Sequence, residues 1–432
     1  MRSCPTNALL VEAGIPPLHL RRIYLAKKFI IKKLSFSRHP LIPLLGQLNI
    51  KIQNSPYWRR KTIPPLIIAY RFFFEIPIHR SPSLLYFTFP LSAGFISNAV
   101  NFDCGLEKGD VNSPVLSNLI FQNFLSLNYP NKDYIYTDAS KTGTQTVGAA
   151  FYHSNAQISC KFKLNTKFSI FSAECIAVLE AIKYVLQSHI ADAIIISDSK
   201  SLLSTLSNPI SNPNNSYIIS LIKYELYKIT NENYSVSFIW CPSHIGVRGN
   251  ETVDLLAKEG ALNGENSMYQ PPYSDLYSEC RSQILEEWQI EWDYSSKIKG
   301  SAIAALQPVP ILRPWFDGLQ LDRHTIVTIG RLRTGHNCLP RHLNKIKIKN
   351  NAHCACGHDC CDENHVLLEC PLLSHQRAIL YRNFKSQNVA LPINMSYLLS
   401  LNNINILKYI AHFFKSSSFK CHTNFSLLSN NP

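Results

Sequence analysis

The sequence is short of acidic residues in its N-terminal part. Its 432 residues include 29 Asp and Glu against 43 Lys and Arg, which gives a net charge of +14. Residues 1–80 contain fourteen Lys and Arg but only two acids, Glu12 and Glu75, whereas residues 132–259 contain eleven residues of each sign. This imbalance favours a polyanionic partner and places the basic excess outside the central stretch.

The sequence also lacks a secretory signal and an uninterrupted apolar span. A charge-free run from Ser81 to Phe102 is long enough to cross a bilayer, but Pro82, Pro90 and several Ser and Asn interrupt it, so we expect no membrane partner. Thirteen cysteines without a signal indicate reduced thiols in the cytoplasm or nucleus rather than a secreted disulfide scaffold. The length and the 46% hydrophobic content predict two or three globular domains.

Four carboxylates stand out between residues 134 and 260, each where an expected strand or helix begins or ends. They lie in the strings IYTDAS, FSAECIAVLEAI, AIIISDSKSLL and WCPSHIGVRGNETVDLLAKEG, and they are Asp138, Glu174, Asp198 and Asp254. Glu180, six residues after Glu174, is turned about 240° away on a helix and is left out of the set.

Periodicity predicts the order βββαβαβα for this stretch. Strands are expected at 134–139, 146–153, 157–164, 193–197 and 236–241, and helices at 172–187, 199–206, 217–229 and 250–260. Ser172 and Asn250 are the expected N-caps, and Gly260 the expected helix end. The order predicts a mixed five-stranded α/β sheet with flanking helices, in which ligands bind beyond the carboxyl ends of the strands where the strand order reverses.

If the first and fourth strands are parallel neighbours, Asp138 and Asp198 meet at that point. Glu174, in the first turns of its helix, and Asp254, one turn into the last helix, can reach the same place. Clustered carboxylates are ligands for Mg²⁺, and paired ions promote in-line hydrolysis of a phosphodiester. The residues alone therefore predict a magnesium-dependent phosphodiesterase.

The strings TDAS, AECIAVLEAI, SDSKSLL and PSHIGVRGNETVDLLAK resemble the type 1 ribonuclease H domains of non-LTR retrotransposon polyproteins, over roughly residues 130–265. The resemblance implies a ribonuclease H-like fold in which Asp138, Glu174, Asp198 and Asp254 bind two Mg²⁺ ions, with Mn²⁺ as a substitute. It implies that the RNA strand of an RNA/DNA hybrid is the substrate, cut to a 3′ hydroxyl and a 5′ phosphate, and that Ser140 and Asn250 contact it. The family usually has Gly after the first Asp, where this chain has the similarly small Ala139.

His244 lies between Pro242 and Gly246, in a loop that can swing, just before the helix that carries Asp254. A histidine near neutrality can carry a proton to a leaving oxygen or help the product depart. By the resemblance it corresponds to the mobile-loop histidine of the family, and we expect it to be catalytic.

The flanking segments carry basic and metal-ligating patterns. LHLRRIYLAKKFIIKKLS, from Leu18 to Ser35, predicts a basic amphipathic helix that either packs with a solvated face or contacts phosphates. Trp288 and Trp292 share a helical face and are expected in a core. Basic residues between Arg331 and Lys349 are expected to form a face for phosphates. Four ligands spaced C-x-C-x8-H-x4-C, with Cys360 or Cys361 as alternatives, predict a structural Zn²⁺ site; they are Cys354, Cys356, His365 and Cys370.

Five segments follow: a basic, Pro- and aromatic-rich region at 1–128, the nuclease domain at 130–265, a helical connector at 266–350, the Cys/His segment at 351–375 and a tail at 376–432. No YxDD-like polymerase string or endonuclease domain is present, so the chain resembles the 3′ part of a retroelement reading frame. The first hypothesis is a hybrid-specific endoribonuclease. The alternative is a catalytically silent protein that binds nucleic acid through its basic N-terminus and Cys/His segment.

Overall fold

The computed structural model describes residues 4–80, 99–106, 113–143, 146–208 and 216–417. The chain forms two compact units, one of residues 1–24 and 281–432 and the other of residues 25–280. We call them the helical unit and the sheet unit. The charge-free run from Ser81 lies mostly outside the described residues, and within them no helix combines the length and the apolar character of a membrane span.

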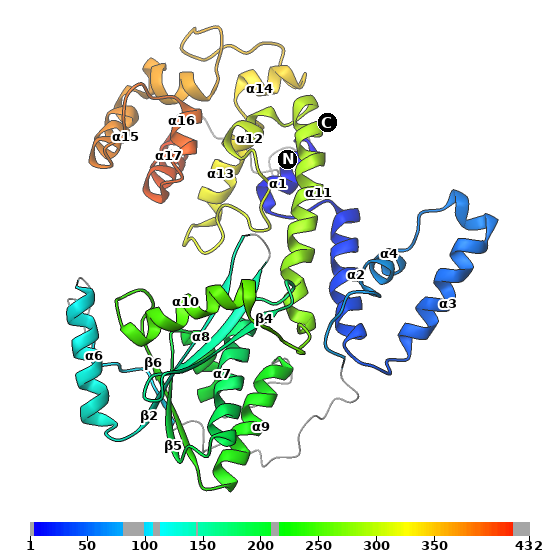
Figure 1. Cartoon of the computed structure of the whole chain (residues 1–432). Coiled ribbons are helices and arrows are strands. Elements are labelled where there is room, and N and C mark those ends of the chain that lie inside the picture. The colour runs from blue at the N-terminus through cyan, green and yellow to red at the C-terminus, as the bar shows by residue number, and fades with distance from the viewer. Residues whose placement is uncertain (1–3, 81–98, 107–112, 144–145, 209–215, 418–432) are drawn as a thin grey trace. The chain divides into compact units, whose positions relative to one another are not determined.

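The sheet unit is built on a mixed sheet in the order β1-β6-β5-β2-β3-β4-β7 (Figure 1). β2, β3 and β4 form the expected antiparallel meander, and β5 and β6 continue the sheet in parallel from the other side of β2. The strands are β1 (Val100–Asn101), β2 (Asp133–Lys141), β3 (Val147–His153), β4 (Ile158–Leu164), β5 (Asp192–Ser197), β6 (Ser235–Trp240) and β7 (Glu265–Asn266).

The five predicted strands are confirmed, and two edge strands are added to them. β1 pairs with β6 and β7 pairs with β4, each over two residues. Two residues are too few for a periodic pattern, so neither strand could be predicted from the sequence. The first strand runs past its predicted end at Ala139 to Lys141, because its pairing with β3 continues there.

Alternate strand residues face two separate cores, as the period of a strand requires. Ile135, Ala193 and Ile195 pack with α7 (Ile170–Gln187), α8 (Lys200–Ser207) and α9 (Tyr217–Asn231). Tyr136, Ile194 and Ile196 pack with α6 (Pro114–Asn128) and α10 (Arg248–Asn263). The sheet is therefore covered on both faces, and Asp138, an even-numbered residue of β2, is on the α10 side.

The boundaries of α10 correct two predictions. The helix begins at Arg248 with Val247 at its N-cap, so Asn250 is not the cap. It also runs past Gly260 to Asn263, because Gly260 serves close packing and does not end the helix. A Cβ at this position would lie 3.2 Å from the Phe162 carbonyl oxygen and 3.3 Å from that of Ala149, so the glycine lets the helix lie directly on β3 and β4.

The cap of α7 also differs from the expected one. The helix begins at Ile170, and the Ser169 hydroxyl accepts a hydrogen bond from the Ser172 backbone N–H at 3.2 Å. Ser172 is inside the first turn, where its own hydroxyl donates to Asp275 Oδ1 at 3.0 Å. The first of the two serines is therefore the cap.

The predicted basic helix is confirmed as α2 (Leu18–Leu34). One of its lysines, Lys27, is buried and lies 4.9 Å from the ring centroid of Phe72, so part of the basic charge packs against protein. The sheet unit also contains α3 (Leu41–Asn54), η1 (Pro56–Arg60), α4 (Pro65–Phe73) and η3 (Tyr273–Asp275).

The helical unit has two cores. Trp288 and Trp292 on α11 (Leu276–Ile298) are each 2% exposed and pack with residues of α1 (Thr6–Ala13), which confirms their predicted place in a core. A larger core joins the C-terminal helices. The other helices are α12 (Ser301–Leu306), α13 (Arg323–Thr334), α14 (Pro340–Lys345), η4 (His365–Glu369), η5 (Pro371–Leu373), α15 (Ser374–Ser386), α16 (Met395–Ser400) and α17 (Ile404–Ser416).

Candidate active site

Two of the predicted acids occupy adjacent positions where the strand order reverses, Asp138 within β2 and Asp198 directly after β5. The chain leaves β2 toward β3 and β4 on one side, and β5 and β6 lie on the other. The parallel pairing of β2 with β5 ends at Thr137 and Ser197, so Asp138 and Asp198 occupy the next position on each strand. This is the place where such sheets bind ligands.

Glu174 reaches the same region from the second turn of α7. Its carboxylate accepts a hydrogen bond from the Ser199 hydroxyl, in the residue directly after Asp198. Glu180, which the sequence left out, is hydrogen-bonded to the Tyr269 hydroxyl at 2.5 Å and paired with Lys183 at 3.0 Å. The two glutamates of α7 thus have separate surroundings, as their helical spacing predicts.

Asp254 and His244 lie together on the α10 side of the sheet. Ligand atoms of His244, Glu251 and Asp254 are all within 4.8 Å of one another. His244 is exposed and has a positive φ of 57°, a backbone conformation uncommon for a residue with a Cβ. Glu251 accepts a hydrogen bond from the Gly246 backbone N–H at 3.2 Å, so it holds the loop that carries His244.

The four predicted acids repel one another. The pKa of Asp138 is raised to about 8, because the carboxyl is buried and because Asp198, Asp254 and Glu174 add negative charge around it. Burial also raises the pKa of Asp198; the charge of Asp254 adds to that effect and the His244 imidazole opposes it. Burial and the charge of Asp198 raise the pKa of Glu174. Because these carboxylates raise one another's pKa values, the cluster suits a divalent cation, which would compensate their negative charge.

The two predicted substrate contacts lie near these acids in sequence and in the fold. Ser140 is half-buried on β2, two residues after Asp138 and on the same face of the sheet. Asn250 is 3% exposed in the first turn of α10. Its side-chain oxygen is buried and finds no hydrogen-bond partner among the described residues.

Sequence reasoning missed two residues that support this site. One is Glu251, whose contact with the Gly246 N–H depends on a loop conformation that the sequence does not show. Trp240, at the end of β6, donates its indole N–H to the Asp198 backbone carbonyl at 3.1 Å. The sequence shows that Trp240 lies at the end of a strand just before Pro242. It does not show that Trp240 lies next to Asp198.

The sheet order and the carboxylates at its switch point define a ribonuclease H-like α/β fold. The RNase H family model matches residues 130–262 of this chain. One matching solved structure is RNase H1 from the halophilic archaeon Halobacterium salinarum NRC-1, at 16% identity and a TM-score of 0.24, covering 30% of this chain and 97% of that chain. No curated protein matches this chain.

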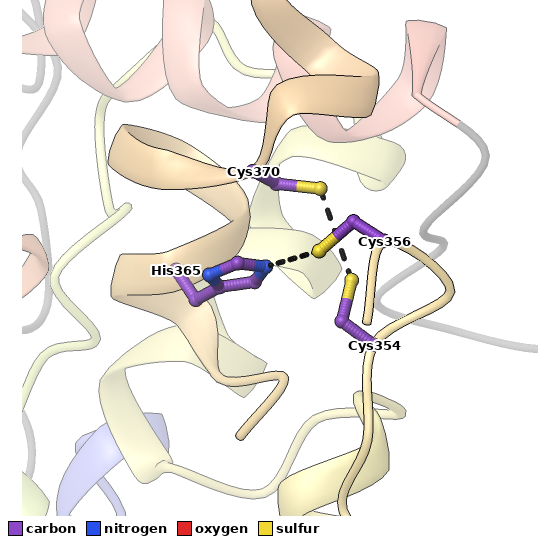
Figure 2. A group of neighbouring side chains, drawn as sticks. All are labelled: Cys354, Cys356, His365 and Cys370. Carbon is purple, nitrogen blue, oxygen red and sulfur yellow. Dashed lines mark hydrogen bonds between the residues drawn. The ribbon is translucent and has the colours of Figure 1, made fainter. Parts of the chain in front are cut away.

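A second cluster, in the helical unit, brings together Cys354, Cys356, His365 and Cys370 (Figure 2). The sulfur atoms of Cys354 and Cys370 are 3.8 Å apart, and Cys356 Sγ lies 3.3 Å from His365 Nε2. Two sulfurs bound to one tetrahedral zinc ion at about 2.3 Å lie about 3.8 Å apart, so the four side chains fit this metal.

The surroundings of this Cys/His cluster also suit a metal ligand set. His365 Nδ1, the ring nitrogen that points away from the cysteines, lies 3.5 Å from a carboxylate oxygen of Glu369. This is an ion-pair distance and not a hydrogen bond, because the buried His365 Nδ1 has no hydrogen-bond partner among the described residues. Of the predicted alternatives, Cys360 is outside the group of four, whereas Cys361 is buried beside it and its side chain interacts with Cys354. All cysteines in the described part of the chain are free thiols.

Proposed function

We propose that the sheet unit is a metal-dependent endoribonuclease that hydrolyses the RNA strand of RNA/DNA hybrids. The observation that carries the proposal is the joint position of Asp138 and Asp198 at the switch point, with Glu174 and Asp254 close enough to raise the pKa of Asp138. The family match to residues 130–262 supports the same reaction. A silent binding protein would have no need for four mutually repelling carboxylates.

In the proposed mechanism, Asp138, Glu174, Asp198 and Asp254 hold Mg²⁺, or Mn²⁺ in its place. When bound there, the metal would activate a water and neutralise charge on the departing 3′ oxygen. His244, exposed at the rim of the site, carries a proton toward that oxygen. Ser140 and Asn250 contact the substrate, where the 2′ hydroxyl distinguishes RNA from DNA.

The test compares three labelled substrates: an RNA/DNA hybrid, an RNA duplex and a DNA duplex, each incubated with the full chain and Mg²⁺. We expect internal cleavage of the RNA strand of the hybrid alone, leaving 3′ hydroxyl and 5′ phosphate ends. Folded protein that binds the hybrid and cuts nothing would establish the silent alternative. Cleavage of the DNA duplex would rule out hybrid specificity.

We further propose that Cys354, Cys356, His365 and Cys370 hold a structural Zn²⁺ ion. The support is the fit of the sulfur spacing and the closed set of four protein ligands, which leaves no position for a substrate. We also propose that the domain derives from a retroelement reading frame, on the strength of the motif strings and the Cys/His segment that follows them.

Replacing Trp240 with phenylalanine tests how Asp198 is held in place. The ring remains, but the N–H that donates to the Asp198 carbonyl is lost. We expect kcat to fall about fivefold with KM unchanged, because one hydrogen bond that orients a ligand is worth roughly 1 kcal/mol. The matched control is Trp58→Phe, which removes the same N–H from a half-buried residue of η1. An equal loss in both variants would contradict the assigned role.

A further inference from the structure

The helical unit contains a cavity that the proposed hydrolysis does not use. Its volume is about 960 Å³, within the range of sites for a nucleotide-sized ligand, and all of its lining residues belong to this one unit. Five parts of the chain form its walls: the start of α1, the connection from α11 to α12, the end of α13, α14, and Glu363 just before η4. Residues 4–7 thus line the cavity together with residues from the C-terminal part of the chain.

The walls carry an excess of positive charge. Lys299, Arg341 and Lys345 line the cavity against a single acid, Glu363. Arg341 is also paired with Asp362 outside the cavity, and its backbone N–H donates to the Cys361 carbonyl at 3.2 Å. This part of the wall is therefore anchored to the segment that carries the Cys/His cluster.

Two histidines also line the cavity. The rings of His336 and His342 are 4.6 Å apart, edge to face. The pKa of His336 is lowered to about 4 because the ring is buried and because His342 and Lys345 lie nearby, and burial also lowers the pKa of His342. Near neutral pH the positive charge of the walls therefore comes from the lysines and the arginine, and not from these histidines.

The N-terminus of α1 adds a second feature that favours an anion. Cys4, Pro5, Thr6 and Asn7 line the cavity, so the helix starts at its wall. Pro5 is at the N-cap, no side chain of the described residues caps the helix there, and the first turn has no acid. The partial positive charge of an uncapped helix start attracts phosphate.

We propose that this cavity binds a phosphate group of a nucleic-acid strand, at a site separate from the four carboxylates. The choice of nucleic acid as the ligand rests on the proposed function.

The structure also removes one residue from the basic face expected between Arg331 and Lys349. Arg333 is buried in an ion pair with Glu12, with both carboxylate oxygens within 3.2 Å of its Nε, so it is not available to a phosphate.

The test measures binding of a labelled single-stranded DNA 12-mer by the full chain, without added Mg²⁺ and without a chelator. Single-stranded DNA is not cut by the proposed activity, so the result does not depend on hydrolysis. The test variant is Lys299→Gln with Lys345→Gln. The matched control is Lys408→Gln with Lys415→Gln, which removes the same charge from exposed positions of α17 outside the lining.

We expect the test variant to bind on the order of tenfold more weakly. Its slope of log affinity against log salt should be shallower by about 1.4, which is two contacts of about 0.7 each for a single strand. The control should show a much smaller loss. Equal losses in both variants would mean that diffuse charge attracts the strand, and the proposal would be wrong.

A second variant separates the cavity from the surface around it. Ala302→Phe keeps every charge but fills space, since Ala302 lines the cavity beside Gly335. We expect a similar loss of binding, with the melting temperature recorded to confirm folding. Unchanged binding would overturn the proposal. Tight binding of adenosine monophosphate with none of the 12-mer would assign the cavity to a free nucleotide, and would overturn its assignment to a strand.

Discussion

Replacing Asp198 with asparagine is expected to lower the rate of hybrid cleavage by about a thousandfold or more while binding of the hybrid survives. Asparagine keeps the shape of the side chain but removes the charge that holds a divalent cation, and metal ions supply several kcal/mol of transition-state stabilisation. Single-turnover cleavage of a labelled hybrid in Mg²⁺ measures the rate. Binding is measured in parallel with Ca²⁺ in place of Mg²⁺.

Asp192→Asn is the matched control for this experiment. It makes the same chemical change at the other end of the same strand, where Asp192 is paired with Lys132 on the surface. Because a surface ion pair is worth little, we expect a rate within about twofold of the wild type. If Asp198→Asn also cleaves near the wild-type rate, Asp198 is not part of the site.

Metal analysis of protein purified without chelator is expected to find about one zinc per chain. The zinc should be absent from the double variant Cys354→Ser with His365→Ala. Because binding of a structural zinc ion contributes directly to folding, chelation should lower the melting temperature of the helical unit by about 10 °C or more.

Cys360→Ser is the control for the zinc prediction. Cys360 lies in the same loop but outside the group of four ligands, so this variant should keep its zinc and its melting temperature. Protein without zinc, or loss of zinc from the Cys360 variant, would show that the assigned ligands are wrong.

Much of the sheet unit follows from the sequence, because its signals are local. The continuous apolar run before Asp198 predicts a strand buried on both faces, and β5 is such a strand. An acid that directly follows a strand in the sequence also lies at the end of that strand in the fold, whatever structure the rest of the chain adopts. The register of β2 against β5 then places Asp138 beside Asp198, as the expected parallel pairing requires.

The sequence could not decide details that depend on contacts between distant residues. Gly260 has the pattern of a helix end, but the backbone of β3 and β4 against it makes it a packing glycine inside α10. Both Ser169 and Ser172 can cap a helix, and Asp275, about a hundred residues later, engages the second of them.

The tertiary structure alone determined which charged and metal-ligating groups act together. Arg333 belongs to a basic string in the sequence, yet Glu12, 321 residues away, pairs with it in the interior. Cys360 and Cys361 were equal alternatives by spacing, yet in the fold Cys361 is buried beside the cluster and Cys360 is not. The composition and local patterns of this chain thus determined its strands, helices and acidic positions. Burial and long-range pairing, which no local pattern encodes, determined which side chains remain available to a ligand.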